Sequence, residues 1–351
     1  MIRSEEARTA ESYPRILQLT SLLLTAILTA CCNSTVANRT HTTRSQEQQH
    51  TRVFIPVDAE PTYHALDGYN PKWQQQIRTG IEMARAFWGS FGPTHVWIAG
   101  QEQGGKVTAA AKDAFLSDYC SWRIAGTQRT LEECRDHATK RFFHVALRGA
   151  AEAYLSWVDE FEQPEAELVF INVHKWFFER DSIPDPTLRG IHEYTHVFQK
   201  AFQETPTWMM EGGAVFAEAW IPWMERRCDF EFFSERMARL MKGAQRIDES
   251  DLSIADMEDI DSAPNKARRY HRELAYDAGA WAIAFLVHKS DSRSVTTFRD
   301  KFYPMVNELG WEQALCRYTG VASKEQFYEE FRALMVAPQQ SQALMLRQIK
   351  P

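Results

Sequence analysis

The chain has 351 residues, 44% of them hydrophobic, and carries a formal net charge of −7 at pH 7. This length allows a well-packed core in one large domain or in two smaller ones. The acidic balance argues against a nucleic-acid-binding protein, which usually presents a basic face, and against attachment to a membrane through charge.

The first 30 residues are predicted to be a signal peptide rather than part of the fold. Residues 16–30 are mostly apolar and follow three arginines. Such a run is short for a membrane span but typical of a signal sequence. It ends in Leu-Thr-Ala before Cys31, which resembles a bacterial lipobox. The resemblance implies that Cys31 is lipidated and anchors an exported protein in the bacterial cell envelope, on its periplasmic or surface side.

The residue after the lipobox cysteine bears on the membrane that is expected. Cys32 stands where an Asp would resemble a signal for retention in the inner membrane, so the outer membrane is predicted. A plain secretory signal or an uncleaved anchor is the alternative, since glutamates weaken the positive charge of the segment.

The remaining chain divides by composition. Residues 31–50 have almost no apolar content and are predicted to form a disordered tether. A single domain is predicted at 51–337, and the polar segment 338–351 is expected to be frayed. Strand and helix patterns are mixed in 51–182, whereas only helical patterns occur in 183–337. This order predicts an α+β fold, with a small mixed-sheet lobe followed by a mainly helical lobe.

Individual elements follow from hydrophobic periodicity. Short β-rich runs predict strands at 53–57, 95–99 and 168–173, and the last is the strongest because it is apolar and β-branched. Apolar residues at helical spacing predict helices in the first lobe at 71–91, 106–121 and 137–160. The same spacing predicts helices in the second lobe at 206–221, 231–243, 270–289, 294–308, 311–318 and 323–335.

Where the two lobes meet, the chain reads H-E-x-x-H from His192 to His196. The two histidines lie at i and i+4 on one stripe of a predicted helix, so their imidazoles can bind one zinc ion. Glu193, between them, can reach the metal-bound water. The neighbouring stripe forms a buried face through residues spaced three and four apart: Leu188, Ile191, Thr195, Phe198 and Phe202.

A catalytic zinc site needs three protein ligands and one open position. Glu211 is the candidate for the third ligand, because it lies in the next predicted helix and can return beside the first one after a short loop. Glu218 lies two turns further along the same face. The alternative is that His192 and His196 are core histidines with this spacing by chance and that Glu211 is an ordinary surface residue.

The segment 192–218 resembles the gluzincin zinc metallopeptidases. It is most similar to the bacterial peptidase-MA-like proteins, whose pattern combines H-E-x-x-H-V-x-Q with P-x-W-x-x-E-G-x-A. These patterns fall here on residues 192–199 and 206–214, and the match is faint elsewhere in the chain. The resemblance implies a zincin-like fold with the zinc site between the two lobes.

The same resemblance implies a role for each residue of the signature. His192, His196 and Glu211 would bind Zn²⁺, and Glu193 would be the general base. Glu218 would support a ligand histidine, with a solvated helix glutamate as the alternative.

The oxyanion of an amide hydrolysis needs one more donor besides the metal. Tyr276 resembles the donor tyrosine of the aminopeptidase-like members, and a core tyrosine is the alternative. His271 and His288 are weaker candidates for this role. His174, which follows the strongest predicted strand, is expected to be structural.

These residues predict zinc-dependent hydrolysis of peptide bonds. The G-x-M-E-N segment of the aminopeptidase branch is absent, which favours an endopeptidase. The strand at 168–173 is expected to offer a sheet edge to an extended peptide. One alternative is an inactive, zinc-binding, peptidase-like lipoprotein that acts as a binding or envelope-assembly module. A zinc hydrolase with a non-peptide substrate is another.

Four cysteines lie beyond the signal segment, which allows two disulfides in an exported protein with three possible connectivities. Cys120 and Cys134 are the closest pair in sequence, and Cys228 and Cys316 are the other two. No C-x-x-C occurs, so a cysteine zinc site is not expected.

Overall fold

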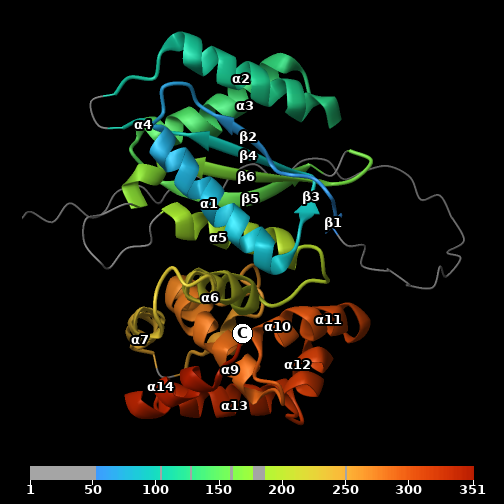
Figure 1. Ribbon diagram of the computed structural model, residues 1–351, viewed down its shortest axis with the longest axis vertical. Helices are drawn as coiled ribbons and strands as arrows, with labels where there is room; N and C mark the ends of the chain where they lie inside the picture. Colours follow the sequence, from blue (N-terminus) through green and yellow to red (C-terminus); the bar gives the residue numbers. More distant parts are fainter. Residues whose placement is uncertain (1–52, 103–104, 127–128, 159–160, 177–185, 250) are drawn as a thin grey trace, which may run out of the picture. The chain divides into compact units, whose positions relative to one another are not determined.

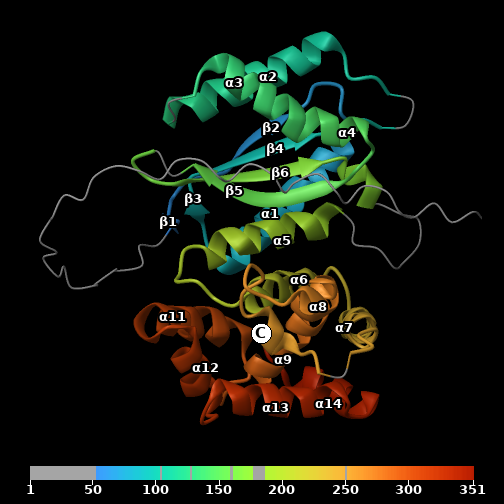
Figure 2. The ribbon, with the colours of Figure 1, turned by 180° about the vertical axis from the view of Figure 1, so that it is seen from behind.

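The protein has an α+β fold in the computed structural model, with its strands in the first part of the chain and mainly helices after them (Figures 1 and 2). This confirms the predicted α+β class. None of the described helices is long and apolar enough to cross a membrane. The predicted signal peptide, the lipobox cysteine and the tether lie outside the described residues, which are 53–102, 105–126, 129–158, 161–176, 186–249 and 251–351.

The main sheet is mixed and has four strands in the order β2–β4–β6–β5. β2 (Thr62–Ala65), β4 (Thr94–Ala99) and β6 (Glu165–Ile171) are parallel, whereas β5 (Glu152–Val158) pairs antiparallel with β6. Apart from this sheet, the short strands β1 (Ile55–Pro56) and β3 (Phe91–Gly92) form an antiparallel pair.

Two of the three predicted strands are therefore confirmed nearly in full, at β4 and β6, and the first is shortened to β1. β2 and β5 were not predicted. β6 lies between β4 and β5, so the expectation that residues 168–173 form a sheet edge is wrong. The edge strands are β2 and β5.

The helix predicted at 137–160 is also wrong in its second half. α3 (Leu131–Ala138) continues through η2 (Thr139–His144) and ends with α4 (Val145–Leu147). Gly149 then adopts a positive φ of 72°, which reverses the chain into β5. Pairing with β6 along seven residues outweighs the helical spacing of the apolar side chains in this segment.

Helices cover both faces of the sheet (Figures 1 and 2). One face carries α2 (Ala109–Arg123) and α3, and Trp97 of β4 packs edge-on against aromatic rings of α2 there. On the other side lie α1 (Pro71–Trp88) and α5 (Pro186–Gln199), which pack on each other. Short 3₁₀ turns follow α2 and β6, at Ile124–Gly126 and Val173–Trp176.

A disulfide joins α2 to α3. Cys120 and Cys134 form it, with their Cα atoms 5.8 Å apart. Cys228 and Cys316 are free, so one of the two disulfides that the sequence allows is present. The bond ties together the helix pair that covers the face of the sheet opposite α5.

The second part of the chain is helical, as predicted, and begins with α6 (Thr207–Met224), which packs against α5 and α9. The predicted helices from 231 to 335 are confirmed, some of them as two or three consecutive segments. The elements after α6 are α7 (Phe230–Ala244), η4 (Ile254–Met257), α8 (Asn265–Arg268), η5 (Arg272–Ala278), α9 (Gly279–Lys289), α10 (Val295–Thr297), η6 (Phe298–Phe302), α11 (Tyr303–Leu309), α12 (Trp311–Thr319), α13 (Lys324–Met335) and α14 (Gln339–Gln348).

The expectation of a frayed C-terminal tail is wrong. Residues 339–348 form α14, and Met345, Leu346 and Ile349 are buried. The backbone N–H of Lys350 donates to a carbonyl of the loop after α9, and its carbonyl accepts from the start of α10. Three apolar anchors in a polar segment suffice to hold it on the helical part.

Glycine pairs allow two helix crossings at backbone contact. A Cβ at Gly190 of α5 would lie 2.4 Å from the carbonyl oxygen of Ile77 in α1, and one at Gly80 would lie 1.9 Å from the carbonyl oxygen of Thr187. The second crossing joins α6 to the start of α9, where a Cβ at Gly212 would lie 2.2 Å from the carbonyl carbon of Gly279. Both crossings lie next to the H-E-x-x-H helix or its partner and so set their spacing.

Gly190→Ala is expected to destabilise the protein by about 2–4 kcal/mol, because both contacting atoms belong to backbone and cannot move independently. Alanine would stabilise an unobstructed helical position by up to about 1 kcal/mol, so the sign of the effect is diagnostic. Gln75→Ala, at an exposed position of α1, is the control and should change stability by less than about 0.5 kcal/mol. Chemical denaturation measures both, and a stabilising Gly190→Ala would contradict the close crossing.

Candidate metal centre

The H-E-x-x-H segment lies in α5, which is held at a fixed rotation about its axis. The indole N–H of Trp88 donates to Thr195 Oγ1 at 3.0 Å, and the backbone N–H of Phe91 donates to the Tyr194 hydroxyl at 3.0 Å. Both partners come from α1 and the strand that follows it. These contacts turn the opposite stripe of α5, with its two histidines, towards α6.

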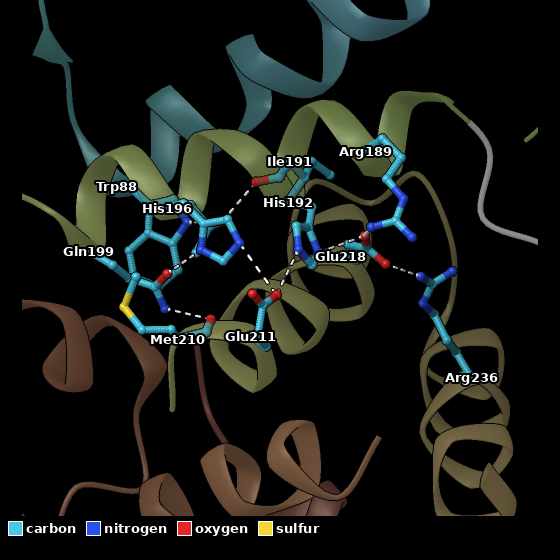
Figure 3. Close-up of polar contacts among 11 residues, drawn as sticks. Trp88, Arg189, Ile191, His192, His196, Gln199, Met210, Glu211, Glu218 and Arg236 are labelled. Atoms are coloured by element: carbon cyan, nitrogen blue, oxygen red, sulfur yellow. Dashed lines mark hydrogen bonds and ion pairs between the residues drawn. The ribbon is translucent and has the colours of Figure 1, made fainter. Parts of the chain in front are cut away.

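Three ligand-type side chains converge between α5 and α6 (Figure 3). Glu211 Oε2 lies 3.4 Å from His192 Nε2 and 3.5 Å from His196 Nε2. The three side chains are largely buried, with Glu211 the most exposed at 22%. Among the described residues they are the group of three that could bind a metal ion.

Polar contacts lie behind both histidines. His192 Nδ1 forms an ion pair with Glu218 Oε1 at 3.0 Å, and His196 Nδ1 lies 2.8 Å from Gln199 Oε1. The Gln199 oxygen can only accept, so a neutral His196 carries its proton on Nδ1 and turns the lone pair of Nε2 to the centre. Glu218 therefore occupies the supporting place that the resemblance implies.

The separations of Glu211 Oε2 from the two Nε2 atoms fit a bound cation, and all three ligand atoms lie within 4.8 Å of one another. A tetrahedral ion with bonds of about 2.0–2.1 Å places its ligand atoms about 3.3–3.4 Å apart. Without positive charge, from a proton or a metal ion, two lone pairs and a carboxylate oxygen would face one another in a buried site. Two imidazoles and one carboxylate would supply three ligands and leave one position of a four-coordinate ion for water.

Charges within the metal-free cluster respond to one another. Burial by itself lowers the pKa of His192, but Glu211 and Glu218 outweigh it and raise that pKa to about 9. Burial by itself raises the pKa of Glu211, but the two histidines outweigh it and hold that pKa well below the usual range. Both pKa shifts show that positive charge between the two histidines and Glu211 stabilises the cluster.

Glu193 borders the cavity at the cluster. It is 3% exposed and lines the same cavity as the three ligands. Burial raises the pKa of its carboxyl, and the two histidines oppose this rise. A carboxylate whose pKa is raised by burial is suited to take up a proton and give it back.

Tyr276 lies at the cavity as well. Its ring is parallel to that of His192, with centroids 6.0 Å apart. Burial, followed by the charge of Glu211, raises the pKa of the phenol far above neutrality, so it remains a hydrogen-bond donor. The residue belongs to η5, a π-helical turn directly before the crossing of Gly279 over Gly212. That crossing positions Tyr276 beside Glu211.

The cavity has a volume of about 540 Å³ and lies between the edge strand β5 and the helices α5 and α6. Ala153, Leu155 and Trp157 of β5 form one wall, and Ile260 with its acidic neighbours forms the opposite rim. The metal cluster and Glu193 lie at its base. The cavity is therefore large enough for several residues of an extended chain.

The other histidines considered from the sequence lie elsewhere. His174 Nδ1 is 3.0 Å from the Tyr69 hydroxyl, a contact that fits a structural role. The ring of His271 packs edge-on against Tyr276 at 5.4 Å, and neither His271 nor His288 lines the cavity. The structure thus brings together His192, Glu193, His196, Glu211, Glu218 and Tyr276 and leaves these three histidines out.

Three supporting residues were not predicted from the sequence. Gln199 is the last residue of the H-E-x-x-H-V-x-Q pattern but was given no role, and Arg189 and Arg236 were not considered. Gln199 Nε2 donates to the carbonyl oxygen of Met210 at 3.0 Å, so this one amide links the His196 ring to α6. A Cβ at Gly213 would lie 2.6 Å from Gln199 Nε2, which explains the second glycine after Glu211.

Comparison of the chain with protein-family models, with curated proteins and with solved structures finds no match. The support for a function therefore comes from the geometry of the site and from the resemblance of its motifs.

Gln199→Leu is expected to weaken metal binding by about 10–100-fold, because the hydrophobic side chain cannot hold His196 by its Nδ1–H. Gln203→Leu is the matched control, since Gln203 lines the same cavity but bonds Asn307 rather than a ligand. Metal affinity measured by competition with a chelator compares the two variants. Equal affinities would show that Gln199 does not orient His196.

Proposed function

We propose that the protein is a zinc-dependent peptidase of gluzincin type, with His192, His196 and Glu211 as the zinc ligands. The observation that carries this proposal is the convergence of two Nε2 atoms on one carboxylate oxygen, at 3.4 and 3.5 Å, beside a buried glutamate and an open cavity. Imidazole and carboxylate donors suit zinc among the common ions. The zincin-like fold is part of the same proposal.

Zinc, when bound here, lowers the pKa of water towards 7 and polarises a carbonyl group. Glu193 accepts a proton from the attacking water and later passes it to the nitrogen of the leaving amine. One C–O bond forms and the C–N bond of the peptide breaks, so the products are a carboxylate and an amine. Tyr276 donates a hydrogen bond to the oxygen on which charge develops.

The substrate is proposed to lie extended along β5. Among the described residues, no strand pairs with the side of β5 away from β6, so its backbone N–H and C=O groups can pair with a peptide that crosses the cavity. A chain bound in this way can continue in both directions, which favours an endopeptidase. Export and a lipid anchor at Cys31 stay predictions from the sequence.

Glu193→Gln is expected to lower kcat/KM for peptide hydrolysis by about 10²–10⁴-fold, because glutamine cannot accept the proton of water. Zinc content should stay unchanged, since Glu193 is not a ligand. Hydrolysis of a peptide library and metal analysis of the same preparations test both points. A wild-type protein that binds zinc but cleaves no peptide would instead support an inactive binding module or a hydrolase of another substrate class.

Tyr276→Phe is expected to lower kcat by roughly 10²-fold while KM and zinc affinity remain unchanged, because the lost hydroxyl acts on charge that develops in the transition state. Tyr270→Phe is the control, since Tyr270 precedes η5 and its hydroxyl bonds Asp248 outside the cavity. Steady-state kinetics with one peptide substrate separates kcat from KM. An unchanged kcat would remove Tyr276 from the mechanism.

A further inference from the structure

A buried carboxylate behind His192 is held by an arginine from a third helix. Glu218 is 4% exposed, and its two oxygens have different partners (Figure 3). Oε1 lies 3.0 Å from His192 Nδ1, whereas Oε2 accepts a hydrogen bond from Arg236 Nη2 at 2.6 Å. Arg189 Nη1 lies 3.7 Å from Oε1. Arg236 itself comes from α7 and is 13% exposed at its side chain.

The two oxygens of a carboxylate are rigidly connected, so a bond to one oxygen orients the other. Arg236 fixes Oε2 and thereby fixes the direction in which Oε1 faces His192. Together with Arg189, it also compensates the charge of Glu218 in its buried place. A neighbouring carboxylate that accepts the Nδ1–H of a ligand histidine orients the ring and strengthens its lone pair.

We propose that Arg236 is a positioning residue for the metal site and acts on His192 through Glu218. The chain of contacts runs from α7 through α6 to α5 and ends at the Nε2 atom that faces the metal. This inference rests on the proposed function insofar as the cluster holds zinc, but it does not depend on the substrate. Arg189 approaches the same carboxylate at the longer distance and leaves the shorter contact to Arg236.

The test compares zinc affinity, by competition with a chelator, in the full-length wild-type protein, Arg236→Met, Arg236→Lys and Lys242→Met. Methionine keeps much of the side-chain volume and removes the charge. Arg236→Met is expected to weaken zinc binding by about 10–100-fold, and Arg236→Lys should restore part of the loss. Lys242 is exposed on the same helix, so Lys242→Met should leave affinity unchanged.

A double-mutant cycle with Glu218→Gln separates positioning from a merely structural ion pair. If Arg236 acts through Glu218, then Arg236→Met combined with Glu218→Gln should bind zinc as tightly as Glu218→Gln alone. The combined variant also lacks the unpaired charge, so it keeps the comparison possible if Arg236→Met alone fails to fold. A folded Arg236→Met with wild-type zinc affinity would overturn the inference, and so would additive losses in the cycle.

The outcomes also separate this inference from the proposed function. A wild-type protein that binds no zinc removes the basis of both. Zinc binding that depends on Arg236 without any peptide hydrolysis would leave the inference standing and reject the peptidase. If the protein hydrolyses peptides but its zinc affinity does not depend on Arg236, the peptidase proposal stands and the inference about Arg236 is rejected.

Discussion

Three electron-rich atoms face one another between α5 and α6, at separations of 3.4 and 3.5 Å. In the metal-free cluster positive charge can come from a proton on His192, because Glu211 and Glu218 raise the pKa of this histidine to about 9. Water would solvate such atoms in the open, but here they lie largely buried. A protein can hold this arrangement only if other contacts fix the two helices at this distance.

Those other contacts are spread over the fold and do not involve the ligands. Gly80 and Gly190 bring α1 against α5, and Gly212 and Gly279 bring α6 against η5 and α9. Gln199 then joins α5 to the backbone of α6. Each contact is short and most are made by backbone atoms, which do not change rotamer. The two helices that carry the three side chains are thus positioned by packing rather than by contacts among those side chains.

The sequence predicted most of the metal cluster because the relevant constraints are local. One helix places His192, Glu193 and His196 by its own period, and the spacing within the next helix places Glu218 two turns after Glu211. Tyr276 was identified by resemblance, and the structure shows the reason for its position in the adjacent glycine crossing. Arg236 carries no local signal, because its role depends on how α7 packs against α6, about 18 residues from Glu218.

The errors in the first part of the chain have the same origin. Residues 152–158 have apolar side chains at helical spacing, yet they pair with β6 because a strand there satisfies seven residues of backbone that a helix would leave outside the sheet. Likewise, α14 is polar in composition but is held by three buried side chains. Contacts with residues distant in sequence determine the structure of both segments, and such contacts cannot be predicted from the spacing of hydrophobic residues alone.

The position of β5 at the edge of the sheet determines what borders the cavity. With residues 168–173 at the edge, a peptide would lie away from α5; with β5 at the edge, the unpaired side of the sheet borders the cavity that contains the ligands. The reversal at Gly149 is therefore what brings a strand edge to the metal cluster. A backbone edge recognises peptide groups rather than particular side chains, so in the proposed peptidase the sheet and the helices would contribute separate parts of one site: the strand would hold an extended chain, and α5 and α6 would present the reacting groups.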